Sequence, residues 1–278
     1  MLFLVYAEKK EKKLKTSSKI LICALVLLLC AAFAFAGGKK EASNSDKAYV
    51  VNKGTLVVGI TDFAPMDYKE GNEWIGFDAD MSVAFAKELG VKCEFIEIDW
   101  DSKSMELENK TIDCVWNGMT LTDGVKKAMA TSNPYCNNAQ IIVTKKALAA
   151  SLKKAEDAKN LKFAVEAGSA GEEAAKENGY NAMAVDTQAA AVMEVAAGTS
   201  EACIIDSLMA AAMVGPGTSY PDLTYSVALT TEEYGVGFRK GSDLVPAIND
   251  FFKKAYADGS MMKAAEKYGT QASIIPQK

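Results

Sequence analysis

Short apolar runs alternate with segments of helical apolar spacing along the first half of the chain. The expected strands cover residues 54–60, 92–98 and 112–116. The expected helices between them cover residues 81–89 and 103–108. Strands that alternate with helices in this order predict a mainly parallel sheet with helices on its faces.

The same alternation begins again after residue 161. A strand is expected at residues 139–144, before this second unit, and further strands are expected at residues 162–166, 202–206 and 234–238. Further helices are expected at residues 172–178, 189–197, 245–258 and 261–268. The two units resemble each other in layout and not in sequence, so we expect two α/β lobes and no internal repeat.

The N-terminal segment differs from the rest of the chain. Six lysines precede an apolar run at residues 20–35, which ends in Ala34-Phe35-Ala36. This pattern predicts a signal peptide at residues 1–36, and the polar residues 37–48 are expected to form a flexible tether. An alternative is a lipoprotein anchored at Cys30, although the residues just before Cys30 are not the small ones usual at such a site.

The charges of the chain exclude several functions. The net charge is −5, and the predicted signal contributes +4, so the remainder carries −9 and nucleic acid is not an expected partner. Histidine is absent, which removes the usual general base near neutral pH and most zinc sites. We therefore expect no catalytic residues, no metal and no cofactor. Arg239 is the only arginine beside 30 lysines, so nearly every cationic role falls to a point charge.

Four cysteines follow the predicted signal, at positions 93, 114, 136 and 203. Export permits disulfides, and the sequence leaves open whether Cys114 and Cys136 pair or stay as buried thiols. Buried thiols are favoured for Cys93 and Cys203.

Polar loops follow two of the expected strands. Ligands of parallel α/β sheets bind beyond the carboxyl ends of the strands, where loops lead into helices. Asn117 and Gly118 permit close backbone approach, Thr120 offers a hydroxyl group, and Thr122 is a candidate helix N-cap. The second unit offers a comparable loop at residues 167–171. The alternative is that these loops are surface turns without a ligand.

Several short motifs, in this order, resemble the extracytoplasmic solute-binding proteins of polar amino-acid ABC transporters. They are Gly54-Thr-Leu-Val-Val-Gly, Phe63-Ala-Pro65, Gly76-Phe-Asp-Ala-Asp80, Ile112-Asp113, Gly118-Met-Thr-Leu-Thr122, Pro134-Tyr135, Gly168-Ser169 and Tyr234-Gly-Val-Gly-Phe-Arg-Lys240. The resemblance implies the type II periplasmic binding protein fold, in which two lobes are joined by two crossover strands. The crossovers would lie near residues 139–144 and 232–238. One lobe would comprise residues 49–142 and 234–278, and the other residues 143–233.

The resemblance also implies which residues bind the ligand. Phe63 and Trp100 would stack on it, although either could instead pack in the core. Polar loops would contribute Asn117, Gly118 and Thr120 from one lobe and Ser169 and Ala170 from the other. Asp206 would receive the α-ammonium group, the alternative being a cap of the next helix. Glu166 would read the side chain of the ligand.

One position departs from the family pattern. The family places an arginine that binds the α-carboxylate where this chain has Val125. Lys126 or Lys127 could replace it, unless both lie on a solvated helix face. Together with Glu166, the missing arginine leads to the hypothesis that the ligand carries an amine or guanidinium group.

These observations favour an exported, monomeric binding protein that captures a polar amino acid or amine and delivers it to an ABC permease. One alternative is an exported dehydratase of the same fold that acts on prephenate or arogenate. Another is a sensor that uses the same fold without transport.

Overall fold

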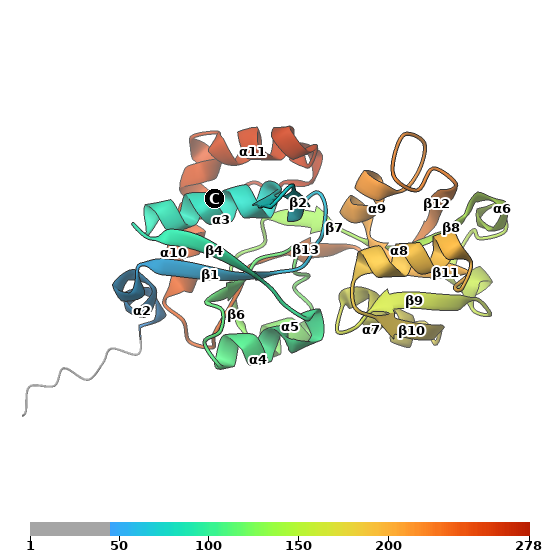
Figure 1. The fold of residues 1–278 in the computed structure, drawn as a ribbon, viewed down its shortest axis with the longest axis horizontal. Helices are drawn as coiled ribbons and strands as arrows, with labels where there is room; N and C mark the ends of the chain where they lie inside the picture. Colours follow the sequence, from blue (N-terminus) through green and yellow to red (C-terminus); the bar gives the residue numbers. More distant parts are fainter. Residues whose placement is uncertain (1–44) are drawn as a thin grey trace, which may run out of the picture. The chain divides into compact units, whose positions relative to one another are not determined.

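A computed structural model describes residues 45–278 (Figure 1). The predicted signal, Cys30 and residues 37–44 of the predicted tether lie outside the described residues. Residues 46–48, expected in the tether, instead begin helix α2 (Asp46–Lys53). The side chain of Ser45 caps this helix by accepting the N–H of Ala48 at 2.9 Å, which explains why the helix starts here.

The first lobe is built on a five-stranded sheet with the strand order β4-β1-β5-β14-β6. These strands are β1 (Thr55–Ile60), β4 (Lys92–Glu97), β5 (Cys114–Val115), β6 (Ala130–Thr131) and β14 (Gly237–Phe238). Strand β1 is parallel to β4 and β5, whereas β14 is antiparallel to β5 and β6. The chain therefore returns to its first sheet after passing through the second. A small hairpin of β2 (Tyr68–Glu70) and β3 (Glu73–Ile75) accompanies this lobe.

The second lobe is built on another five-stranded sheet, with the order β10-β9-β11-β8-β12. Its strands are β8 (Gln140–Lys145), β9 (Lys162–Glu166), β10 (Asn181–Val185), β11 (Ala202–Asp206) and β12 (Leu223–Ala228). Strands β9, β10 and β11 are parallel, and β8 runs antiparallel to its neighbours β11 and β12. In each sheet, one antiparallel strand thus interrupts an otherwise parallel arrangement, as the prediction of mainly parallel sheets requires.

Helices cover both sheets (Figure 1). Those of the first lobe are, besides α2, the helices α3 (Phe77–Glu88), α4 (Lys103–Glu108), α5 (Asp123–Ala128), α10 (Leu244–Ala257) and α11 (Ser260–Tyr268). Those of the second are α6 (Lys146–Ala149), α7 (Ala170–Glu177), α8 (Gln188–Ala197) and α9 (Ser207–Met213). Because all five residues of β11 are buried, both faces of that strand are covered, as expected for a central parallel strand. No helix within residues 45–278 has the length and apolar character needed to cross a membrane.

Two short strands connect the lobes. Strand β7 (Cys136–Asn138) pairs with β13 (Glu232–Tyr234) in an antiparallel ribbon that belongs to neither large sheet. Strand β7 lies just before the segment 139–144 that was expected as the first crossover, and residues 140–145 instead form β8 inside the second sheet. Strand β13 lies within the segment 232–238 that was expected as the second crossover. The lobe boundaries at residues 142/143 and 233/234 stay a prediction.

Arg239 holds several segments of the first lobe together. Its Nε atom lies 2.9 Å from Asp46 Oδ1, and its Nη1 atom donates to the carbonyl oxygens of Leu107 and Ile112 at 3.2 and 2.8 Å. Its Nη2 atom lies 3.5 Å from Asp113 Oδ1. One planar cation therefore contacts helix α2, the end of α4 and the segment just before β5. A lysine could not make these contacts at once, because it lacks the fork of donors that arginine has.

The substitution Arg239→Met is expected to destabilise the protein by about 3–5 kcal/mol, because it removes the ion-pair partner of the largely buried Asp46 and the donor to the carbonyl oxygens of Leu107 and Ile112. Asp113 loses only its more distant cation, since Lys53 Nζ remains 2.7 Å from its Oδ2 atom. Urea unfolding measures the difference. The control Lys254→Met removes an exposed ion pair with Glu88, and its effect on stability is expected to be much smaller. Equal losses for both variants would contradict the structural role of Arg239.

Candidate functional site

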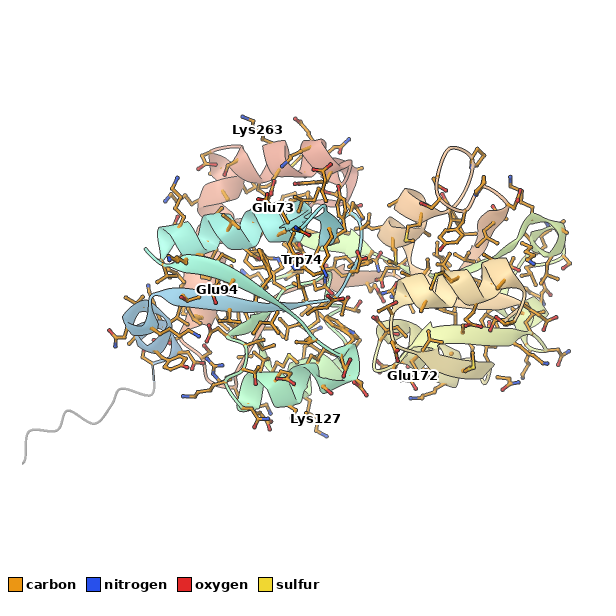
Figure 2. All side chains as sticks on the ribbon, in the orientation of Figure 1. Glu73, Trp74, Glu94, Lys127, Glu172 and Lys263 are labelled. Carbon is orange, nitrogen blue, oxygen red and sulfur yellow. The ribbon has the colours of Figure 1, made fainter. Side chains whose placement is uncertain are left out.

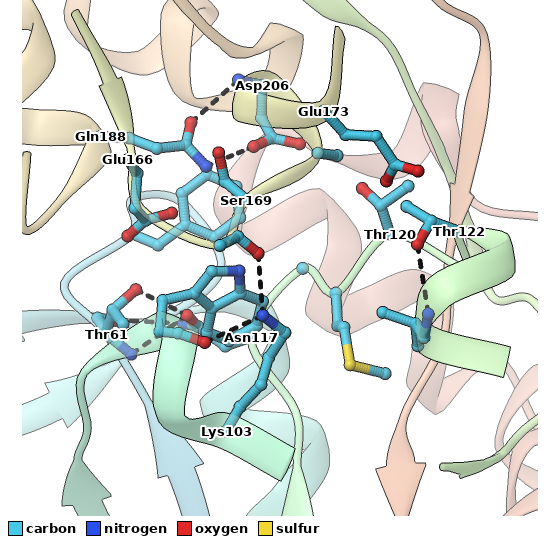
Figure 3. A pocket seen from close by; sticks show the side chains of 17 residues that line it. Thr61, Lys103, Asn117, Thr120, Thr122, Glu166, Ser169, Glu173, Gln188 and Asp206 are labelled. Atoms are coloured by element: carbon cyan, nitrogen blue, oxygen red, sulfur yellow. Dashed lines mark hydrogen bonds between the residues drawn. The ribbon is translucent and has the colours of Figure 1, made fainter. Parts of the chain in front are cut away.

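A cavity of about 50 Å³ is lined by residues of both lobes, beyond the carboxyl ends of β1, β5, β9 and β11 (Figure 3). All the residues expected to bind a ligand line it: Phe63, Trp100, Asn117, Gly118, Thr120, Glu166, Ser169, Ala170 and Asp206. The sequence therefore brings these residues to one place. Their role in binding stays a prediction.

Two aromatic side chains form the apolar part of the wall. Phe63 is 3% exposed and packs edge-on against Tyr234, with 6.4 Å between the ring centroids. Its ring lies so close to Gly118 that a Cβ atom there would meet Phe63 Cε1 at 2.2 Å, and the φ of Gly118 is +52°. Glycine is therefore required at this position. Trp100 is also largely buried, in a separate cluster of the first lobe, so both rings pack in the core and line the cavity at once.

Asn117 uses its side chain inside the protein. Its Oδ1 atom accepts the N–H and the hydroxyl of Thr61 at 3.0 and 2.7 Å. Its Nδ2 atom donates to Thr61 O and to Asp67 Oδ2 at 3.1 and 2.8 Å. These four bonds use the amide group, so Asn117 fixes the loop. Its side chain lines the cavity but has little remaining capacity to bond a ligand.

The N–H of Gly118 is also engaged, because it donates to Asp78 Oδ2 at 2.7 Å. The hydroxyl of Tyr135 donates to the same oxygen at 2.7 Å. Burial raises the pKa of Asp78 to about 7, and burial together with the charge of Asp78 raises the pKa of Asp67 well above its usual value. Two buried carboxyl groups, those of Asp67 and Asp78, therefore accept hydrogen bonds from the first-lobe loop and fix its position. The sequence analysis gave neither residue a role.

Two threonines shape the rim. Thr120 donates its hydroxyl to Glu232 Oε1 at 2.8 Å. Thr122 caps α5 as predicted, its hydroxyl accepting the N–H of Val125 at 3.2 Å. Both line the cavity and also a larger neighbouring cavity of about 500 Å³, whose wall includes Glu173 and Glu177.

Glu166 is the last residue of β9 and is 3% exposed. Burial raises the pKa of its carboxyl to about 8, the nearby Asp206 adds to the rise, and Lys103 opposes it. A cationic ligand would supply the charge that favours the ionised form. Ser169, on the following loop, caps α7 by accepting the N–H of Glu172 at 3.1 Å.

Asp206 ends β11, and its side chain does not cap the helix that follows, so the alternative of a helix cap is wrong. Four donors surround the carboxylate: the amides of Asn138, Gln140 and Gln188, and the hydroxyl of Tyr234. Glu232 accepts from the first two of these amides, at 2.6 and 2.8 Å. Burial, followed by the charge of Glu232, raises the pKa of Asp206 to about 7. Within residues 45–278, Asp206 is thus a buried acceptor that has hydrogen-bond donors but no ion-pair partner.

Sequence reasoning missed several residues of the wall, among which Gln188, Lys103 and Glu173 carry polar or charged groups. Gln188, at the start of α8, donates to Asp206 and accepts its N–H at 2.9 Å. Lys103, at the start of α4, places its ammonium group in the cavity wall (Figure 3). The apolar Leu107 four residues after Lys103 is no distinguishing signal, because other lysines such as Lys87, which precedes Val91, have the same spacing.

The lysines proposed as substitutes for the missing arginine lie elsewhere. Lys126 and Lys127 are exposed, and neither lines the cavity that contains Asp206. Figure 2 shows Lys127 pointing away from the body of the lobe. Val125 lines the cavity with an apolar side chain. The solvated helix face therefore fits Lys127, whereas the exposed Lys126 lines the larger neighbouring cavity.

The cysteines that follow the predicted signal are free thiols, so the possible bond between Cys114 and Cys136 is not formed. Cys114, Cys136 and Cys203 are buried, and burial raises the pKa of the thiol in each. These side chains serve as small core residues.

The raised pKa of Glu166 predicts a pH dependence of stability. Between about pH 4.5 and pH 8 the folded protein holds a proton here that the unfolded chain releases, so the free energy of unfolding falls as the pH rises. Glu166→Gln is expected to reduce this slope by up to about 1.4 kcal/mol per pH unit. Urea unfolding from pH 5 to pH 8 tests this. The exposed Glu177→Gln is the control, and an unchanged slope in Glu166→Gln would contradict the prediction.

Comparison with known proteins agrees with this architecture. The L-cystine-binding protein TcyJ of Escherichia coli (strain K12) is 30% identical over 224 residues, which cover 79% of this chain and 84% of that protein. The arginine-binding extracellular protein ArtP of Bacillus subtilis (strain 168) is 31% identical over 255 residues, 88% of this chain and 97% of that protein.

A solved structure extends the similarity to the fold. It is that of an ancestral amino acid-binding protein, AncCDT-1, described as a precursor of cyclohexadienyl dehydratase. The TM-score is 0.73 at 34% identity, over 81% of this chain and 99% of that chain. The two-lobe α/β fold expected from the sequence is thereby confirmed. Residues 56–271 match the family of bacterial extracellular solute-binding proteins, family 3, and the chain belongs to that family.

Proposed function

We propose that this protein captures an amino acid with a cationic side chain and delivers it to the permease of an ABC transporter. The charge of the cavity wall carries the proposal. The side chains of Glu166, Glu173 and Asp206 line the cavity, and among the described residues of its wall the one cation is Lys103. A zwitterion with an additional positive charge complements this balance better than an acidic amino acid does.

The geometry suggests a role for each carboxylate. Asp206, in the site that the family resemblance assigns to the α-ammonium group, would bind it. Glu166, on the neighbouring strand, would bind the side-chain cation, because its buried carboxyl has no ion-pair partner within residues 45–278. The relative ArtP is named for the binding of arginine, an amino acid with a cationic side chain, and this supports the proposal.

Capture requires movement of the lobes. A volume of about 50 Å³ holds only a few water molecules, whereas sites for small molecules typically enclose about 300–1,000 Å³. The ribbon of β7 and β13 connects the lobes and is where rotation would occur. The ligand would stabilise the form in which both lobes contact it, and the permease would recognise that form.

Transport in this way fits an exported monomer. We propose that residues 1–36 direct export and that the mature chain acts outside the cytoplasm, either free or anchored at Cys30.

A second candidate is suggested by AncCDT-1, which is described as a precursor of a dehydratase. A substrate such as prephenate carries two carboxylates, and the wall offers the single ammonium group of Lys103 to hold them. Binding without turnover is therefore the preferred proposal. Incubation with prephenate and arogenate, followed by chromatography of the products, tests it, and measurable conversion would overturn it.

The proposal predicts that L-arginine, L-lysine or L-ornithine raises the thermal unfolding temperature of the mature protein more than L-glutamine, L-cystine or L-glutamate does, because a bound ligand stabilises the folded state. Calorimetry then measures the affinities. Glu166→Gln is expected to weaken binding of the cationic ligand by about 10–100-fold, whereas Glu177→Gln should not. Tight binding of glutamate or aspartate without binding of the cationic amino acids would contradict the proposal.

A further inference from the structure

The ammonium group of Lys103 lies where the two lobes touch. It donates to the carbonyl oxygen of Trp100 in its own lobe and to that of Gly168 in the second lobe, at 2.9 Å each. Its Nζ atom also lies 4.7 Å from the centre of the Trp100 ring. Lys103 is only 8% exposed, so both carbonyls and the ring hold the charge away from bulk water.

The backbone contact at this point is close. A Cβ atom on Gly168 would lie 2.6 Å from Asp101 Cα, and the φ of Gly168 is +69°. Glycine is needed here for both reasons. The loop that precedes α7 therefore rests directly on the segment that carries Lys103, and a group bound between them would contact both lobes.

Lys103 is a buried cation without a counter-ion. An ammonium group has three N–H donors, and two of them are used by the carbonyl oxygens. Within residues 45–278, no carboxylate lies within ion-pair distance of it. Burial lowers the pKa of Lys103 to about 8, although Glu166 and other carboxylates oppose this effect. An anionic group in the cavity would complete the missing half of an ion pair.

A second donor lies across the cavity. Ala170 begins α7 and also lines the wall. The first N–H groups of a helix have no acceptor within the helix. Here the hydroxyl of Ser169 accepts the N–H of Glu172, and the carbonyl oxygen of Ser169 accepts that of Glu173. A carboxylate between Lys103 and Ala170 would meet an ammonium group from one lobe and an amide from the other.

We propose that Lys103 binds the carboxylate of the ligand, in place of the arginine that is absent at position 125, and that this contact joins the two lobes. The inference rests on the proposed function, because it assumes an amino-acid ligand. It assigns the anionic end of the ligand to a residue on α4, whereas the cationic ends face Glu166 and Asp206.

Calorimetry with L-arginine and L-argininamide tests the inference, because the second probe replaces the carboxylate by a neutral amide and leaves both cations. The wild-type protein is expected to bind L-arginine at least about 10-fold more tightly than L-argininamide. Lys103→Met should weaken L-arginine binding by about 10–100-fold and L-argininamide binding by less than about 3-fold. The control Lys127→Met replaces an exposed lysine that lines neither this cavity nor its larger neighbour, and it should change neither affinity.

A further pair of variants separates charge from structure. Lys103→Gln keeps a donor for the carbonyl of Gly168 and should lose the discrimination between the probes as Lys103→Met does. Adding Val125→Arg to Lys103→Met should restore at least part of the discrimination, because it supplies a guanidinium at the wall. Thermal unfolding of each variant without ligand verifies that it is folded.

Four outcomes would overturn the inference. Equal losses for both probes in Lys103→Met would mean that the lysine only holds the lobes together. A wild-type protein that does not distinguish the probes would contradict recognition of the carboxylate by any group. Absence of binding of every amino acid would contradict the proposed function as well, whereas arginine binding that survives Lys103→Met and Lys103→Gln unchanged would contradict the inference alone.

Discussion

The site depends on the cost of burying carboxylates in a place with few cations. Asp206 is 4% exposed, and neutral donors take the place of water around it. Two of those donors come from the ribbon between the lobes, Asn138 on β7 and Tyr234 on β13. Asp206, the acceptor proposed for the α-ammonium group, is therefore hydrogen-bonded to the ribbon about which the lobes would rotate. A charge bound at Asp206 and a rotation of the lobes would both change this hydrogen-bond network.

The same constraint explains why the cavity would prefer a cation. Burial raises the pKa of both Glu166 and Asp206. A ligand cation placed beside them would lower both pKa values, and the released protons would leave two ionised carboxylates facing it. The affinity for a cationic ligand would therefore increase with pH over the range in which these groups titrate.

Much of the fold follows from patterns in the sequence, and the failures have physical reasons. Helix α4 and strands β9 and β11 have the predicted bounds, because their apolar spacing and flanking residues act locally. The strand expected at 234–238 is two strands, since the chain leaves the ribbon with β13 and joins the first sheet with β14. That break depends on the partner strands, which lie about 100 residues away in sequence. Strands β10 and β12 were missed for the same reason, since sheet pairing stabilises them.

The order of the family motifs was sufficient to locate the residues of the cavity wall, but it could not predict the contacts that each side chain makes. Asn117 and Gly118 lie in the cavity wall as expected, yet contacts with distant residues occupy the Asn117 amide and the Gly118 N–H. A short sequence motif contains no information about such partners. Lys103 shows the reverse, because only the fold distinguishes it from 29 other lysines.

The distribution of cations leads to a last consequence for recognition. The single arginine of the chain is used in the first lobe, where its fork binds Asp46 and two carbonyl groups. A lysine then remains for the cavity, and an ammonium group bonds a carboxylate through single contacts and not through two parallel ones. Such a contact fixes the position of the anion less strictly than a guanidinium does. Orientation of the ligand would then rest on Asp206 and Glu166, which lie on neighbouring strands and define the line between its two positive charges.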